Sequence, residues 1–272
     1  MAQPQDPLPR IWDPDERIGT MLKGKRGLVV GIANDRSIAF GCATKLREFG
    51  ADLAVTYLNK TAESFVRPLA DQLAAEIIMP LDVETPGALD RVFDSIAAQW
   101  GRLDFVVHSI AFAPRADLHG RVIDVSEDGF AQAMRVSCWS FLRMCHLAER
   151  LMDHGGVLLT MSYYGADKVI NNYNVMGPVK AALEASVRYA ANELGPKGIR
   201  VFALSPGPLR TRAASGIAAF DQLIDMAIAR APSGRLVDIA EVGRVCAFLV
   251  SGASSGMTGS TIFVDGGLHT VG

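Results

Sequence analysis

Short apolar segments alternate with helical segments along almost the whole chain. RGLVVGI (residues 26–32) is rich in β-branched residues, and SIAFGCATKLREFG (37–50) follows it with helical periodicity and a closing glycine. Similar apolar runs begin near residues 52, 76, 103, 156, 200 and 260, so about seven strands are expected. Continuous apolar strands separated by helices predict an α/β fold in which helices cover both faces of a parallel sheet.

This doubly wound, Rossmann-type sheet is expected to form a single domain over residues 22–272, after a flexible leader at residues 1–21. The chain has 272 residues, 49% of them hydrophobic, which is enough for a large core. The leader lacks the basic and apolar regions of a secretory signal, and no run reaches the length of about 18 apolar residues that a membrane span needs. We therefore expect a cytoplasmic protein that does not enter a membrane.

Charge and cysteine spacing argue against two further classes of partner. The formal charge of -2 and the pI of about 6.2 leave no basic excess to neutralise a nucleic-acid backbone. The four cysteines show neither a CxxC pair nor metal-ligand spacing with histidines. We expect no nucleic-acid partner and no metal site.

The loop after the first strand has the features of a dinucleotide site. GIANDRSIAFG (31–41) joins this strand to the first helix, where a pyrophosphate would meet backbone N–H groups and the positive end of the helix dipole. Gly31 permits a tight turn, but Ser37 and Ile38 stand where a glycine pair is usual, so the fingerprint is incomplete. Ser37 can cap the helix, donate to a phosphate, or do both.

The ends of the next two strands leave the choice of cofactor open. TYLNK (56–60) lacks the acid that often binds the ribose 2'-hydroxyl of NAD. Lys60 either favours a 2'-phosphate or is a solvated lysine at the start of a helix. Asp82, at the end of an apolar strand, either binds an adenine amino group or caps a turn.

SYYGADKVINNYNVMGPVK (162–180) offers two pairings of tyrosine with lysine. Tyr164 and Lys168 have the Tyr-x3-Lys spacing of ordinary short-chain dehydrogenases, but they follow the strand too closely to lie on a helix. Tyr173 and Lys180 are seven residues apart, which is about 700° along a helix, so the two side chains would point alike. Pro178 suits a first helical turn and places Tyr173 at or just before the helix.

The set Tyr163, Tyr173 and Lys180 resembles the Tyr-x6-Lys signature of the enoyl-acyl-carrier-protein reductases, a divergent branch of the short-chain reductases. HSIAFAP (108–114), ELGPKGIRV (193–201) and SPGPLRTRAASGI (205–217) are also similar, and the resemblance runs from about residue 22 to the C-terminus. Ser137 stands where ordinary ketoreductases usually have an asparagine that relays a proton.

The resemblance implies reduction of the trans-2 double bond of an enoyl thioester on acyl carrier protein, with NADH or NADPH, by a homotetramer. Tyr173 would stabilise the enolate through the thioester carbonyl oxygen, Lys180 would hold the nicotinamide ribose, and Tyr163 would be an active-site partner. The implied substrate-binding residues are Ala113, Tyr163 and Tyr173. The implied cofactor-binding residues are Gly31, Ser37, Ile38, Leu58, Asp82, Val83, Ile110, Lys180, Leu209, Arg210, Thr211, Arg212 and Ala213.

Three alternatives stay open from the sequence. The segment that often offers basic residues to the acidic carrier in this family has Ala218, Asp221 and Gln222 here, so a specialised reductase with another acyl carrier is one alternative. A short-chain carbonyl (3-ketoacyl) reductase is the second. The third is a nucleotide-binding regulatory protein without turnover.

Overall fold

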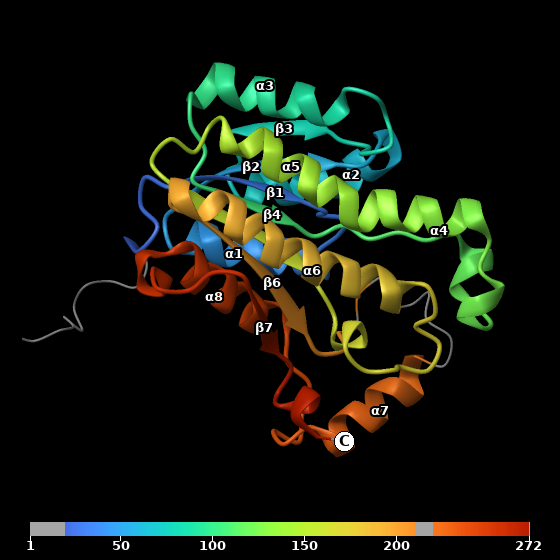
Figure 1. Ribbon diagram of the computed structural model, residues 1–272. Helices are drawn as coiled ribbons and strands as arrows, with labels where there is room; N and C mark the ends of the chain where they lie inside the picture. The colour runs from blue at the N-terminus through green and yellow to red at the C-terminus, as the bar shows by residue number, and fades with distance from the viewer. Residues whose placement is uncertain (1–19, 210, 212–219, 272) are drawn as a thin grey trace, which may run out of the picture.

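Seven parallel strands form one sheet in the order β3-β2-β1-β4-β5-β6-β7 (Figure 1). The computed structural model describes residues 20–209, 211 and 220–271. The prediction of an α/β, Rossmann-type parallel sheet with about seven strands is confirmed. The strands are β1 (Arg26–Val30), β2 (Asp52–Tyr57), β3 (Ile77–Pro80), β4 (Phe105–His108), β5 (Gly156–Met161), β6 (Ile199–Pro206) and β7 (Ser260–Val264).

Both faces of the sheet are buried, which explains why its strands are continuously apolar. Neighbouring residues of a strand point to opposite faces, so Leu28 joins one core and Val29 joins the other. On β4, Val106 likewise packs in the first core and Val107 in the second. A strand with water on one face would instead alternate apolar and polar residues.

Helices cover the sheet in two layers (Figure 1). Residues of α3, α5 and α6 share one core, and residues of α1, α2 and α8 share the other. The elements of the first layer are α3 (Ala88–Trp100), α4 (Glu127–Met134), η4 (Arg135–Trp139), α5 (Ser140–Glu149) and α6 (Met176–Leu194). Those of the second layer are α1 (Ile38–Glu48), α2 (Lys60–Gln72) and α8 (Ile239–Val250).

Two glycines let α1 and α8 approach backbone to backbone. A Cβ added at Gly41 would lie 2.4 Å from the carbonyl oxygen of Ile239, and one added at Gly243 would lie 2.3 Å from the carbonyl oxygen of Gly41. Real Cβ atoms do not come so close to a backbone oxygen, so any side chain at either position would push the helices apart.

The long helical segment after residue 126 is not one regular α-helix. It runs through α4, the single π-helical turn η4 and α5. Within η4, the Ser137 hydroxyl accepts from the Phe112 amide at 3.0 Å and donates to the Phe112 carbonyl at 3.2 Å. The Ser140 hydroxyl donates to the Val136 carbonyl at 2.6 Å. The turn therefore anchors the loop that follows β4, and π-turns are frequent at functional sites.

The remaining helical elements are short, except α7 (Phe220–Arg230), which lies beyond the sheet near the C-terminus (Figure 1). Leu268 packs there with Ala227 of this helix and with Ala231, the residue after its end. Among the described residues, no helix combines the length and apolar character needed to cross a bilayer. The short elements are η2 (Arg115–Leu118), η3 (Val122–Asp124), η5 (Tyr164–Ala166), η6 (Gly195–Lys197), η8 (Gly252–Ser254) and η9 (Leu268–Thr270).

Candidate active site

The candidate site lies where the strand order reverses. β1 pairs with β2 on one side and with β4 on the other, so the loops after β1 and β4 diverge at the carboxyl end of the sheet. Open parallel sheets bind ligands at this kind of switch point. Gly31 follows β1, Ile110 lies two residues beyond β4, and Tyr163 lies two residues beyond β5, so the fold brings these predicted residues to one edge.

The turn after β1 needs a glycine. Gly31 has a φ of +110°, and a Cβ at this position would lie 2.1 Å from the carbonyl oxygen of Ser109. The missing side chain lets the first loop pack directly on the loop after β4. The chain then enters α1, whose first-turn N–H groups offer hydrogen-bond donors to an anion.

Ser37 is the N-cap residue of α1 by position, but its hydroxyl does not cap the helix. It donates instead to the Asn34 carbonyl at 2.7 Å and accepts from the Ala33 amide at 3.4 Å. The side chain therefore braces the turn between residues 33 and 37, and the capping interpretation of Ser37 is wrong for its side chain. Ile38 begins the helix directly after it.

The loops beyond β2 and β3 carry the side chains predicted for the adenosine half. Leu58, directly after β2, is 55% exposed. Lys60 extends into solvent and forms a 2.9 Å ion pair with Glu63. The Asp82 carboxylate accepts from the Glu84 amide at 2.9 Å, so it caps a turn.

Other predicted binding residues lie deeper. Val83 and Ile110 pack against the core beneath the sheet edge. Ala113 packs in a small apolar cluster with Tyr173 and the start of α6. The Thr211 amide donates to the Leu209 carbonyl at 2.7 Å. Three predicted cofactor residues lie outside the described residues: Arg210, Arg212 and Ala213.

Tyr163 and Tyr173 come together although ten residues separate them. Their rings meet edge to face with centroids 4.9 Å apart, and the Tyr164 ring lies 4.8 Å from Tyr163 on a similar tilt. The Tyr163 hydroxyl is buried and has no hydrogen-bond partner among the described residues. An unpaired buried hydroxyl is costly unless a bound group completes it, so this atom fits a ligand site.

Tyr173 is not helical, so the calculation that placed it on one helix face with Lys180 does not apply. α6 begins at Met176, three residues later. The neighbours of Tyr173 hold it in place through left-handed backbone, with φ of 63° at Asn172 and 43° at Asn174. Asparagine tolerates this conformation better than most residues, and such positions are frequent at functional sites.

Both tyrosines retain their phenolic protons at neutral pH. Burial raises the pKa of Tyr163 well above its ordinary value, and the neighbouring Tyr164 adds to the effect. Burial also raises the pKa of Tyr173, and the Glu184 carboxylate raises it further. Each phenol can therefore donate a hydrogen bond to an oxygen that develops negative charge.

Lys180 brings a buried cation to the same place. The residue is 5% exposed, and its Nζ donates to the Met161 carbonyl at 2.6 Å. Burial lowers its pKa to about 8, while Cys138 and Glu184 oppose this effect. An ammonium has three N–H donors, so donors remain for a ligand after the contact with Met161.

Sequence reasoning missed two polar groups beside this lysine. Glu184 accepts a 2.5 Å hydrogen bond from Ser162, and only its position four residues after Lys180 hinted at a shared helix face. His108 is buried between Thr160 and Ser140, with 2.8 Å contacts to both hydroxyls. Burial lowers the pKa of His108 to about 3, with the Lys180 charge adding to it, so this imidazole is neutral.

Tyr164 and Lys168 do not form the ordinary catalytic pair. Tyr164 begins the short η5 turn, and Lys168 Nζ lies 3.5 Å from Oδ2 of its neighbour Asp167. As expected, both residues precede the long helix that follows β5. α6 begins only after both residues, so the two side chains share no helix face.

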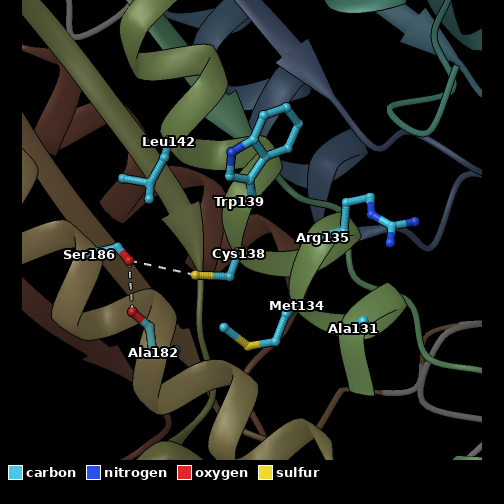
Figure 2. A pocket seen from close by; sticks show the side chains of 8 residues that line it. All are labelled: Ala131, Met134, Arg135, Cys138, Trp139, Leu142, Ala182 and Ser186. Carbon is cyan, nitrogen blue, oxygen red and sulfur yellow. Dashed lines mark hydrogen bonds between the residues drawn. The ribbon is translucent and has the colours of Figure 1, made fainter. Parts of the chain in front are cut away.

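A pocket of about 580 Å³ opens on the outer side of the helical layer (Figure 2). Trp139 and Leu142 border it from the long helical segment, and Ala182 and Ser186 border it from α6. Cys138 points toward Ser186, with Sγ and Oγ 3.5 Å apart. Its lining is largely apolar and includes none of the predicted catalytic or cofactor-binding residues.

Comparison with known proteins gives consistent matches. Residues 31–269 match a family described as enoyl-(acyl carrier protein) reductase. The chain is 48% identical over 252 residues to enoyl-[acyl-carrier-protein] reductase [NADH] 1 of Rhizobium meliloti (strain 1021), covering 93% of each chain.

Solved structures agree with this match. One is an enoyl-(acyl-carrier-protein) reductase from Anaplasma phagocytophilum in complex with NAD, with a TM-score of 0.90, 44% identity, and coverage of 93% of this chain and 97% of the other. Another is the Bacillus cereus enoyl-acyl carrier protein reductase with NADP+ and indole naphthyridinone. Its TM-score is 0.90 at 43% identity, with coverage of 93% and 99%.

Proposed function

The chain belongs to the enoyl-(acyl carrier protein) reductase family, and from this premise we propose how its own residues perform the reaction. It is an NADH-dependent oxidoreductase that reduces enoyl-acyl-carrier-protein in fatty-acid synthesis. The observation that carries our assignment of roles is the contact between the half-buried rings of Tyr163 and Tyr173, with the buried Lys180 bound to the end of β5.

Tyr173 donates the hydrogen bond that makes the double bond reducible. When bound, NADH would supply a hydride for the β-carbon of the enoyl thioester, and water would supply the proton for the α-carbon, which gives the saturated product. As negative charge moves to the thioester carbonyl oxygen, the phenol of Tyr173 stabilises it. Its raised pKa supports this role, because a protonated phenol can donate, and Ala113 beside the ring offers an apolar wall to the acyl chain.

Tyr163 is the second phenol of the site. Its hydroxyl is buried without a partner among the described residues, so a substrate or cofactor oxygen would complete it. The contact between its ring and Tyr173 also limits how far the Tyr173 ring can turn.

Lys180 holds the cofactor. Below about pH 8 its ammonium is charged, and the donors left after the Met161 contact suit the nicotinamide ribose hydroxyls. Gly31 and the start of α1 suit the pyrophosphate. A Cβ at Gly31 would clash with the loop after β4, so only glycine fits this turn, and the N-terminal end of a helix favours an anion. No acid follows β2, so NADPH is a second cofactor under this proposal.

The surroundings of Ser137 argue against the alternative of a carbonyl reductase. Its hydroxyl both accepts from and donates to the backbone of Phe112, which occupies it in fixing a loop. A ketoreductase needs a polar side chain at this place to relay a proton to a newly formed alkoxide. Reduction of a carbon–carbon double bond forms an enolate and does not need that relay.

Steady-state oxidation of NADH tests the proposed reaction and separates the alternatives. We expect turnover with a crotonyl thioester and little with an acetoacetyl thioester, and activity on the ketone alone would contradict the proposal. Binding of NADH without turnover on any thioester would favour the regulatory alternative. Comparing carrier-linked with CoA-linked crotonyl substrates, each with NADH and NADPH, identifies the carrier and the cofactor preference.

The homotetramer remains a proposal, and the outer face of the helical layer supports self-association. Trp139 is 51% exposed and borders the pocket with the exposed Leu142. Two other elements of this layer also expose large side chains, α4 with Phe130 and α6 with Tyr189, which is 73% exposed. Apolar side chains gathered on one face commonly mark an interface. A monomeric mass in light scattering would contradict this proposal. A cytoplasmic location likewise remains a proposal, and residues 1–19 of the predicted leader lie outside the described residues.

A further inference from the structure

Two residues of α6, one helical turn apart, bind two consecutive residues at the end of β5. Lys180 Nζ donates to the Met161 carbonyl at 2.6 Å, and the Ser162 hydroxyl donates to Glu184 Oε1 at 2.5 Å. Tyr163 is the next residue along the chain. The strand end that carries this tyrosine is thus tied to α6 at two points.

The contact with Glu184 is the stronger kind of hydrogen bond. A hydroxyl bound to a carboxylate gives a shorter and stronger bond than one between neutral groups, and 2.5 Å is at the short end of the usual range. Glu184 is partly buried, so bulk water screens the contact less than it would at the surface. Two anchors along one strand fix its end against both sliding and rotation.

Glu184 lies one helical turn after Lys180 on α6, and its charge raises the pKa of that lysine. The other groups that act on Lys180 are the Cys138 thiol from η4 and His108 from β4. His108 is neutral at physiological pH, because its pKa is about 3. Cys138 and Glu184 both raise the pKa of Lys180, and of these two groups Glu184 is the carboxylate that is also tied to the end of β5.

We propose that Glu184 is a positioning residue: held by Ser162, its carboxylate fixes the end of β5 and supplies the counter-charge for the ammonium of Lys180. The inference rests on the proposed role of Lys180 in cofactor binding. Cofactor binding by Lys180 then depends on Glu184, one turn further along α6, and Glu184 need not touch the substrate.

The direction of the pH effect follows from the charges. Glu184 raises the pKa of Lys180 against the effect of burial. Without this charge the pKa falls below about 8, so the ammonium loses its proton at a lower pH. NADH affinity should then decline at a lower pH than in the parent.

The test uses Glu184→Gln, which keeps the shape and an oxygen acceptor for Ser162 but removes the charge. NADH affinity of the purified protein is measured by fluorescence from about pH 6 to pH 10, without substrate. We expect the midpoint of the decline to move down by about one pH unit, so that affinity near the parent midpoint is several-fold lower. Glu193→Gln is the matched control, because Glu193 is exposed on the same helix, and its profile should equal that of the parent.

An unchanged profile in Glu184→Gln would overturn the proposal. Lys180→Ala separates this failure from failure of the proposed cofactor role: if Lys180→Ala binds NADH as the parent does, the lysine itself does not hold the cofactor. If Glu184→Gln does not fold, Ser162→Ala carries the test, since it keeps the carboxylate but releases it. A several-fold loss of NADH affinity in Ser162→Ala supports the proposal, and parental affinity overturns it.

Discussion

Replacing Lys180 by methionine should change how the stability of the cofactor-free protein depends on pH. Burial lowers the pKa of this lysine from its ordinary 10.5 to about 8. The difference corresponds to about 3 kcal/mol by which the folded protein disfavours the charged form. Lys180→Met keeps the length of the side chain and removes the titrating group.

The sign follows from the protons bound in each state. Between about pH 8 and pH 10.5 the unfolded chain keeps the proton of Lys180 while the folded protein loses it. The free energy of unfolding of the parent therefore rises with pH across this window, relative to that of the variant. Below about pH 8 the folded protein bears the full cost of the buried charge, partly offset by the bond to Met161.

Urea unfolding at a fixed protein concentration, repeated at several pH values, measures this difference. From pH 8 to pH 10.5 the free energy of unfolding of the parent should rise by about 3 kcal/mol relative to that of Lys180→Met. Lys197→Met, at an exposed lysine of η6, should run parallel to the parent. Parallel curves for the parent and Lys180→Met would refute the reasoning, because they would mean that Lys180 titrates alike in both states.

Two other predictions concern the frame of the site and its choice of cofactor. Gly243→Ala places a Cβ 2.3 Å from the Gly41 carbonyl oxygen and should destabilise the protein by about 1–3 kcal/mol in thermal unfolding, whereas Gly252→Ala, with open space around it, should not. A loss in Gly252→Ala as large as that in Gly243→Ala would contradict the packing argument. Glu63→Gln removes the partner of Lys60 at the end of β2 and should raise the ratio of kcat/KM for NADPH over NADH several-fold. An unchanged ratio would mean that this lysine does not reach the 2'-phosphate.

The sequence predicted the sheet well because its strands are buried on both faces. Runs such as RGLVV are apolar without interruption, and this pattern alone implies helices above and below a parallel sheet. The Tyr-x6-Lys spacing likewise directed attention to Tyr163, Tyr173 and Lys180. The structure places the two tyrosines in contact and Lys180 against the same strand end.

The local geometry of the site could not be predicted from spacing. Tyr173 lies before α6 between two left-handed asparagines, and this backbone depends on tertiary packing that periodicity does not express. The π-turn η4 depends on the bond between Ser137 and a distant loop. The contact between Ser162 and Glu184 joins a strand to a helix 22 residues later, so only the folded chain reveals it.

The most direct test of the central claim follows the hydride. The enzyme is supplied with NADH deuterated at the transferable position and with a trans-2-enoyl thioester, and the product is analysed by mass spectrometry and NMR. We predict a saturated thioester with deuterium at the β-carbon, formed at a much lower rate by Tyr173→Phe although this variant binds NADH as the parent does. A product without deuterium at that carbon, or an undiminished rate in Tyr173→Phe, would contradict the account.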